Sequence, residues 1–171
     1  MKHSSAGGGI PRCSDRVTPR QNGAMDQPGT SAYTDMGGSP FFQTLVHHFY
    51  AGVSNDPLLT AMYPEDDLAP AERRLLMFLE QYWGGPTTYG DERGHPRLRM
   101  RHAPFAIDAA ARDRWLESMR AALDAAIAEH GLAPALEQEL WAYLVSAAHA
   151  MLNTESPEPP RQGITMSEKP R

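Results

Sequence analysis

Apolar and aromatic residues recur every three to four positions along much of the chain, which is the spacing of one face of an α-helix. The first such stretch follows Ser39-Pro40, a pair typical of a helix N-cap and first turn, and Asp56-Pro57 ends it. Pro70 opens a second stretch, which Gly84-Gly85-Pro86 terminates. The positions that define the two faces are Phe41, Phe42, Leu45, Val46, Phe49, Tyr50 and Val53, and then Leu75, Leu76, Phe78, Leu79, Tyr82 and Trp83.

Two further helices are predicted in the C-terminal half. Asp108 is a candidate N-cap for a long helix that runs to about Glu129, and Gly131 breaks it. Pro134 starts a last helix that continues to Leu152. Their apolar positions are Trp115, Leu116, Met119, Leu123 and Ile127, and then Leu136, Leu140, Tyr143, Leu144, Ala147, Met151 and Leu152.

The pattern therefore predicts an all-α protein with four substantial helices, because no segment alternates as a half-buried strand does. The segment from Gly84 to His102 shows no helical spacing and contains Gly90, Gly94 and Pro96. A loop of about 18 residues inside a compact domain is usually functional or wrapped around something.

Composition excludes several classes of protein. The formal net charge of −5 argues against nonspecific nucleic-acid binding, which needs a basic surface. Cys13 is the single cysteine, so an internal disulfide and a four-cysteine zinc site are excluded. No apolar run approaches the roughly 20 residues that span a bilayer. The N-terminus also lacks the apolar stretch of a secretory signal, so we expect a cytoplasmic protein.

Glycine and proline are concentrated at the two ends of the chain. Residues 1–31 contain few large apolar side chains, so we expect a disordered leader, with Met25 as an alternative start. Residues 154–171 include Ser156-Pro157-Glu158-Pro159-Pro160 and are expected to form a disordered, Pro-rich tail. The ordered domain is expected over residues 32–153.

Histidines are the first candidates for chemistry, because the chain has no phosphate-binding glycine loop, His-Glu-x-x-His motif or nucleophile elbow. His47 and His48 are adjacent on a predicted helix, so their side chains diverge by about 100° and do not share a metal. His102 closes the run Arg97-Leu98-Arg99-Met100-Arg101-His102. A neutral imidazole there suits a metal in an anionic cofactor, and a packed core or surface histidine is the simpler alternative.

Aromatic residues give a second indication of a site. Tyr50, Tyr63, Tyr82, Trp83 and Trp115 fall on apolar faces. Most such residues pack in a core, but a buried Tyr O–H or Trp N–H needs a hydrogen-bond partner. Their convergence in a small helical domain would create a polar pocket inside an apolar shell.

Three contiguous motifs carry a resemblance to a known family. They are Tyr63-Pro64-Glu65-Asp66-Asp67-Leu68, Met77-Phe78-Leu79-Glu80-Gln81-Tyr82-Trp83-Gly84-Gly85-Pro86 and Arg93-Gly94-His95-Pro96-Arg97-Leu98-Arg99-Met100-Arg101-His102-Ala103-Pro104-Phe105. In this order they closely resemble the truncated haemoglobins of group II, of the actinobacterial O type, and the similarity runs from about Tyr33 to Asn153. The resemblance implies a truncated globin, in which two antiparallel helix pairs form a two-over-two sandwich around haem. The long irregular segment would replace most of the proximal helix and end in a short turn that carries the iron ligand.

By motif position, the resemblance implies that His102 is the proximal ligand of the haem iron. Its Nε2 would bind iron, and its Nδ1–H would donate to a carbonyl that fixes the tautomer. The absence of Cys-x-x-Cys-His indicates haem b, bound noncovalently. Arg101 and Arg99 are the expected partners of the haem propionates, because arginine suits bidentate contact with a carboxylate. The apolar and aromatic haem contacts implied are Leu75, Phe78 and Tyr82.

The resemblance also implies a polar pocket on the distal side of the haem. Ala71 matches the position where many globins carry a distal histidine. Tyr50, Tyr63 and Trp115 match the three residues that replace it. Their O–H and N–H groups are donors at neutral pH and would stabilise bound O₂, which carries superoxide-like negative charge.

The function implied is that of a haem protein that reversibly binds O₂ and releases it slowly, with NO, CO or peroxide as other small ligands. NO dioxygenation, or peroxidase and peroxynitrite chemistry, is the alternative, and a haem-based sensor is less favoured. The sequence has no flavin or nicotinamide motif, so turnover would need a separate reductase. A cofactor-free helical interaction module is the runner-up from another class, and homo-oligomerisation stays open.

Overall fold

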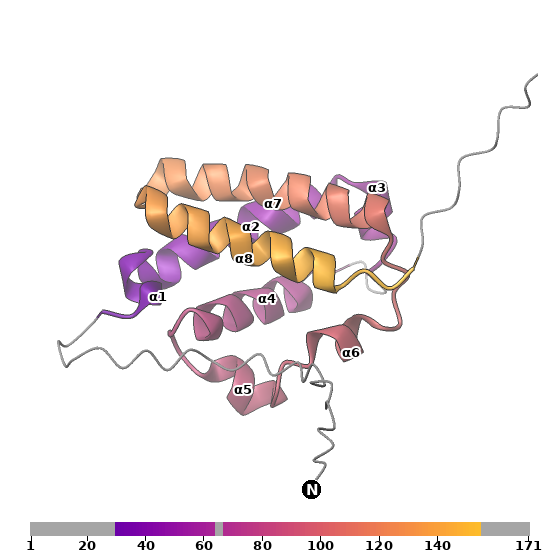
Figure 1. Cartoon of the computed structure of the whole chain (residues 1–171), viewed down its shortest axis with the longest axis horizontal. Coiled ribbons are helices and arrows are strands. Elements are labelled where there is room, and N and C mark those ends of the chain that lie inside the picture. Colours follow the sequence, from indigo (N-terminus) through magenta and orange to yellow (C-terminus); the bar gives the residue numbers. More distant parts are fainter. Residues whose placement is uncertain (1–29, 64–66, 155–171) are drawn as a thin grey trace, which may run out of the picture.

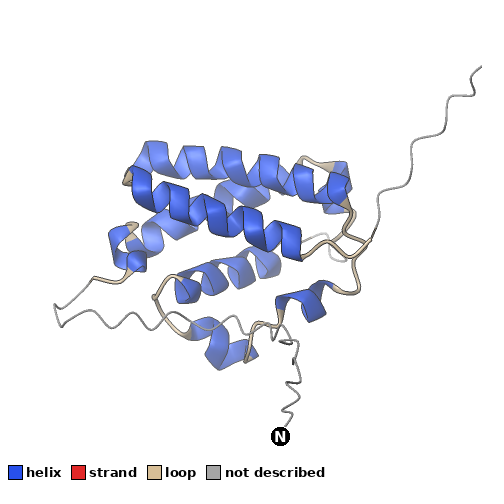
Figure 2. Cartoon of the chain, viewed as in Figure 1, coloured by secondary structure: helices blue, strands red, loops and turns tan. Residues whose placement is uncertain are grey.

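The computed structural model describes residues 30–63 and 67–154. These residues form helices and connecting segments without a strand, as Figures 1 and 2 show. The predicted all-α class is therefore confirmed. The expected disorder of the leader and tail concerns residues 1–29 and 155–171, which lie outside the described residues.

Four long helices make up the body of the domain. They are α2 (Gly38–Ser54), α4 (Ala69–Tyr82), α7 (Ala109–His130) and α8 (Pro134–Ala150). Helix α2 packs against α4 and α7, and α7 packs against α8 (Figure 1). The turn around Gly131 makes α7 and α8 run antiparallel. These are the four helices that the apolar spacing predicts.

Burial explains why these segments are helical. All seven predicted apolar positions of α2 are buried, so this helix lies at the centre of the hydrophobic core. Met119 and Leu123 of α7 and Leu140 and Leu144 of α8 meet the same core. An apolar stripe at helical spacing is stabilised mainly by such packing.

Helix ends agree less closely with the prediction. Gly37, with φ 101°, is the N-cap of α2, so the helix begins one residue before Ser39. Asp56 does not simply end α2, because its side chain caps the next helix by accepting from Leu58 N at 2.9 Å. Asp108 caps α7 by accepting from Ala111 N at 2.9 Å, as predicted. Helix α8 ends at Ala150, so Met151 and Leu152 lie beyond it and not within it.

Four short helices were not predicted from spacing, and two of them correct the expected irregular segment. They are α1 (Ala32–Asp35), α3 (Pro57–Thr60), α5 (Thr88–Arg93) and α6 (Leu98–His102). Tyr89 is the one buried residue of α5, and α6 has none, so neither has an apolar stripe. Tertiary contacts hold α5 instead: Gly90 N donates to Gln81 Oε1 at 2.7 Å, and Arg73 Nη1 donates to Glu92 Oε2 at 2.6 Å. Across residues 30–63 and 67–154, no helix has the length and apolarity needed to cross a membrane.

Candidate functional site

A cavity of about 620 Å³ lies between α2, α4, α6, α7 and α8. Its volume falls in the range of small-molecule and cofactor pockets, roughly 300–1,000 Å³. Most of the lining is apolar or aromatic. The predicted site residues that line it are Tyr50, Tyr63, Ala71, Leu75, Phe78, Arg101, His102 and Trp115.

His102 is the C-terminal residue of α6 and is half-buried on the cavity wall. Its Nδ1 lies 2.8 Å from the carbonyl oxygen of Leu98, one helical turn earlier. Because a carbonyl only accepts, Nδ1 carries the proton and Nε2 keeps its lone pair. His149 makes the same contact with Val145 O at 2.8 Å, but it is exposed and does not line the cavity. The combination of a fixed tautomer and a place on the cavity wall therefore sets His102 apart from His149 as a candidate ligand.

Tyr50 of α2 and Tyr63, which follows α3, meet edge to face with ring centroids 5.9 Å apart. Burial raises the pKa of Tyr50, and the neighbouring Tyr63 raises it further. Burial also raises the pKa of Tyr63, although the hydrogen bond with Tyr50 opposes that rise. Both phenols are therefore neutral near pH 7, and each carries a proton for the other or for a ligand.

Trp115 reaches the same cavity from α7 and is half-buried. Its ring packs against Phe49, with centroids 5.2 Å apart. Among the residues that the structure describes, its indole N–H has no hydrogen-bond acceptor. An indole is a donor only, so Trp115 offers a proton to a ligand in the cavity.

The α4 wall is mostly apolar and contains one small residue. Ala71 is buried, and Leu75 and Phe78 follow it at the spacing of one helix face. Ala71 has no polar side-chain atom, so the donors available to a ligand come from α2, α7 and the segment after α3.

Two predicted cofactor contacts do not line this cavity. Tyr82 is 53% exposed and stacks on Tyr143, with ring centroids 3.9 Å apart, and Tyr143 lines the cavity in its place. Arg99 is exposed and lines a separate, smaller cavity. Arg101 does line the main cavity, and its guanidinium donates to Pro96 O at 2.8 Å and to Arg93 O at 2.9 Å.

Sequence reasoning missed three arginines on the cavity wall, Arg74, Arg93 and Arg112. Arg74 follows Ala71 by three residues, so its place on the same face of α4 was readable from the spacing. The guanidinium groups of Arg74 and Arg93 form no ion pair within 4.0 Å in the described part of the chain, whereas Arg112 pairs with Asp113 at 2.6 Å. The charge of Arg74 partly opposes the rise in the pKa of Tyr50 and Tyr63. Cations on this wall suit a ligand with carboxylates.

Within the described ranges, no three His, Cys, Asp or Glu side chains come together in a way that could hold a metal ion. A site with one histidine suits a metal whose other ligands come from a cofactor. The donors, the apolar wall and the arginines of this cavity are compatible with such a cofactor if it carries negative charge.

Comparisons with known proteins agree with this geometry. The family described as Bacterial-like globin matches residues 31–153. The group 2 truncated hemoglobin YjbI of Bacillus subtilis is 38% identical over 121 residues, which cover 71% of this chain and 88% of that protein.

Solved structures give the same result for the fold. A thermostable hemoglobin from the actinobacterium Thermobifida fusca is 56% identical, with a TM-score of 0.67, over 72% of this chain and 98% of that one. A hemoglobin from Chloroflexus aurantiacus is 44% identical, with a TM-score of 0.68, over 74% of this chain and all of that one (100%). The expected two-over-two helical arrangement is thereby confirmed, with α2 and α4 as one pair and α7 and α8 as the other.

Proposed function

Since the chain belongs to the bacterial-like globin family, as a truncated haemoglobin, we propose that it holds haem b and binds O₂ reversibly. The observation that carries this proposal is the position of His102. Its Nε2 is left free by the bond from Nδ1 to Leu98 O, and it faces a cavity that Tyr50, Tyr63 and Trp115 also line.

The residues present fit a noncovalent haem. The cavity of about 620 Å³ is large enough for a flat aromatic cofactor and is mostly apolar. His102 would hold the iron, and Leu75 and Phe78 would pack on the ring. Haem supplies an iron centre at which O₂, NO, CO or peroxide binds.

Arginines of the cavity wall would hold the two propionates. Arg74 and Arg93 are the better placed, because their guanidinium groups have no carboxylate partner among the described residues. Arg101 lines the same cavity but already donates two hydrogen bonds to backbone carbonyls. Arg99 would reach a propionate only after turning away from its own cavity.

The distal donors would hold a small anionic ligand and slow its release. The O–H groups of Tyr50 and Tyr63 and the N–H group of Trp115 would be the donors, because all three residues line the cavity. A hydrogen bond to a charged acceptor is worth roughly 1.5–3 kcal/mol. We therefore infer slow O₂ release, which suits O₂ retention or reaction better than delivery.

The proposal extends to the subgroup of the protein, to a redox role and to its location in the cell. The 56% identity to the Thermobifida fusca hemoglobin supports the actinobacterial O type of group II. A redox role in NO oxidation or peroxide reduction would use the same donors and would require electrons from a separate reductase. We place the protein in the cytoplasm, where such reductants are available.

The test is haem binding by the purified protein with His102 changed. His102→Ala should lose tight haem binding, or give an altered absorption spectrum that added imidazole restores. His149→Ala is the matched control, since it removes the same contact to a backbone carbonyl outside the cavity. A normal spectrum and normal haem retention in His102→Ala would overturn the assignment. Stopped-flow O₂ release from the ferrous protein then tests the slow off-rate.

A further inference from the structure

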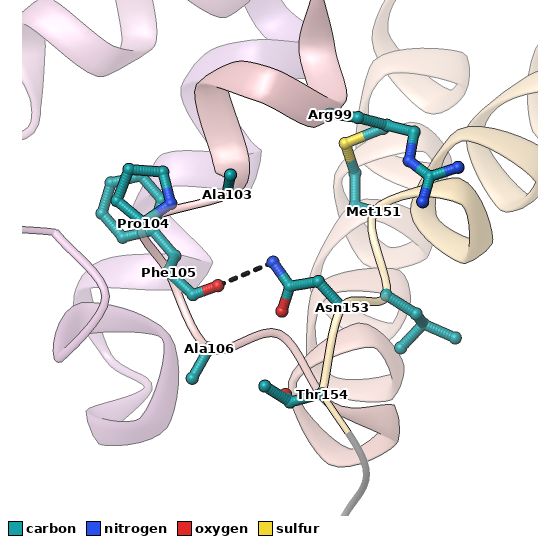
Figure 3. A pocket seen from close by; sticks show the side chains of 9 residues that line it. Arg99, Ala103, Pro104, Phe105, Ala106, Met151, Asn153 and Thr154 are labelled. Carbon is teal, nitrogen blue, oxygen red and sulfur yellow. Dashed lines mark hydrogen bonds between the residues drawn. The ribbon is translucent and has the colours of Figure 1, made fainter.

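The side chain of Asn153, just beyond the end of α8, bridges to the segment that joins α6 and α7. Its Nδ2 donates to Phe105 O at 2.8 Å (Figure 3) and to His102 O at 3.3 Å. Its Oδ1 accepts from Ile107 N at 2.9 Å. All three bonds reach a six-residue stretch that begins with His102.

The chemistry of this bridge requires an amide. Ile107 N–H only donates, so it needs the amide oxygen, and the carbonyls of His102 and Phe105 only accept, so they need the amide NH₂. The two amide hydrogens and the oxygen are thus all used. The backbone adds two bonds beside it, from Asn153 N to Ile107 O at 3.0 Å and from Thr154 N to Ile107 O at 3.2 Å.

Helix α6 depends on polar anchors because it has no buried residue. Arg101, its fourth residue, ties it to Pro96 O and Arg93 O in the segment that precedes it. At its end, Asn153 holds the carbonyl of His102 itself. The His102 ring is tied to Leu98 O within the same helix, so the ring moves when the helix moves.

A separate cavity of about 360 Å³ lies beside the bridge and is lined by Ala103, Pro104, Phe105 and Asn153 (Figure 3). On that side, fewer packed atoms oppose a shift of the α6–α7 segment once the amide bonds are lost. The Asn153 amide is therefore the side chain that links the end of α8 to the carbonyl of His102.

We propose that Asn153 is a positioning residue for His102, which sets how far the imidazole Nε2 reaches into the main cavity. Asn153 does not touch the cofactor site itself, since it does not line that cavity. The inference rests on the proposed haem binding through His102. Partners that orient a metal ligand typically contribute 10- to 100-fold in metal affinity or activity.

The experiment compares three variants of the haem-loaded protein. Asn153→Leu keeps a similar volume and removes all three side-chain bonds. Asn153→Asp keeps the acceptor for Ile107 N but loses both donor bonds and turns a charge toward two carbonyls. Thr154→Ala is the control, because it changes a neighbour on the same small cavity and keeps the backbone bond to Ile107 O.

Two measurements are made on each variant: the iron–histidine stretching frequency by resonance Raman of the ferrous protein, and the rate of haem transfer to apomyoglobin. Both Asn153 variants should shift the frequency and speed haem transfer by about 10-fold, and Thr154→Ala should change neither. A lower melting temperature with an unchanged frequency in the Asn153 variants would mean structural support only and would overturn the proposal. Should Asn153→Leu not fold, Asn153→Asp alone gives the same decision.

Failure of the proposed function is distinguishable from failure of this inference. If the wild-type protein takes up no haem, or His102→Ala leaves its spectrum unchanged, haem binding through His102 is wrong. If the iron–histidine mode is present in the wild type, is lost in His102→Ala and is unchanged in the Asn153 variants, only the positioning role is wrong.

Discussion

The rings of Tyr50 and Tyr63 meet at 72°, with centroids 5.9 Å apart, so their phenols lie within reach of each other on the cavity wall. This pairing divides the three distal donors into two kinds. Either phenol can donate to the other or to a ligand, whereas the Trp115 indole can only donate. The three residues should therefore respond differently when each is removed.

Loss of the indole donor should have the largest effect on O₂ release. Trp115→Phe should raise the off-rate by about 10- to 100-fold, since a hydrogen bond to a charged acceptor is worth roughly 1.5–3 kcal/mol. Tyr63→Phe and Tyr50→Phe should each raise it less, because the phenol that remains can turn its O–H to the ligand. Stopped-flow O₂ release measures all three.

The double variant Tyr50→Phe/Tyr63→Phe checks whether the tyrosines replace each other. Its effect should exceed the sum of the two single effects in free energy, as expected for coupled neighbours. An unchanged off-rate in Trp115→Phe would show that the indole only packs and that the tyrosines hold the ligand without it.

Arg74 should contribute to haem retention. Arg74→Met keeps much of the apolar stem and removes the charge that lies on the cavity wall. Haem transfer to apomyoglobin should become about 10-fold faster, since a propionate loses a charge-assisted hydrogen bond. Arg73→Met is the matched control on the same helix, because Arg73 pairs with Glu92 and does not line the cavity. Equal transfer rates in the two variants would contradict a role of Arg74 at the cofactor.

The ion pair between Asp56 and Arg114 should make stability depend on pH in the acid range. Burial alone would raise the pKa of the Asp56 carboxyl, but hydrogen bonds from Arg114 Nε at 2.7 Å and from the N–H groups of Leu59 and Leu58 together lower it. A folded pKa below the unfolded value of about 3.9 stabilises the fold above that pH, and this is lost as the pH falls through the folded pKa.

Asp56→Asn tests this dependence, because the amide keeps an acceptor for the cap and loses the charge. Its melting temperature should fall less steeply than that of the wild type as the pH drops below about 4. Thermal unfolding between pH 7 and pH 2.5 measures the difference. Parallel curves for the two proteins would show that the pair contributes nothing to acid stability.

Gly85 is expected to be intolerant of any side chain. A Cβ there would lie 2.8 Å from Glu80 O and 2.8 Å from Tyr33 Cδ2, and the backbone carbonyl cannot turn aside. Gly85→Ala should destabilise the fold by about 1–3 kcal/mol, the usual range for overpacking. Gly52→Ala, inside α2, is the control, since its Cβ would make an ordinary 3.4 Å contact with Ser118 Cβ of α7. It should stabilise the protein by up to about 1 kcal/mol in chemical denaturation.

The ends of the chain should be dispensable for the site. A protein trimmed to residues 30–155 should keep its haem and its O₂ affinity, because the removed segments have few large apolar residues. Melting temperature and O₂ affinity of the trimmed protein check this. A large fall in either would show that one end docks on the domain.

The four long helices were predictable because each buries an apolar face. Residues such as Phe41 and Leu123 are buried at the spacing that the sequence shows. Helices α5 and α6 were not predictable in this way, because hydrogen bonds and ion pairs to other segments hold them. The bond from Asn153 to α6 could not be predicted from the residue spacing within α6, because Asn153 lies 51 positions after His102.

The candidate site was predictable where it rested on motif position. The resemblance named eight residues that the structure brings to one cavity, His102 and Trp115 among them. It placed Arg99 beside Arg101, but the two side chains line different cavities, because residues two positions apart on a helix point about 200° apart. Arg93 had no pattern that could find it, since its place depends on how α5 and α6 fold against α4.

The absence of any buried residue in α6 has a consequence for the order in which this protein is assembled. Segments with little apolar burial open at a lower free-energy cost than the core. The sandwich of α2, α4, α7 and α8 can therefore form first. Helix α6, which carries His102, would still be open at that stage and would leave room for the cofactor to enter. Among the helices, amide hydrogen exchange in the apoprotein should be fastest in α6, and it should slow markedly once the cofactor is bound.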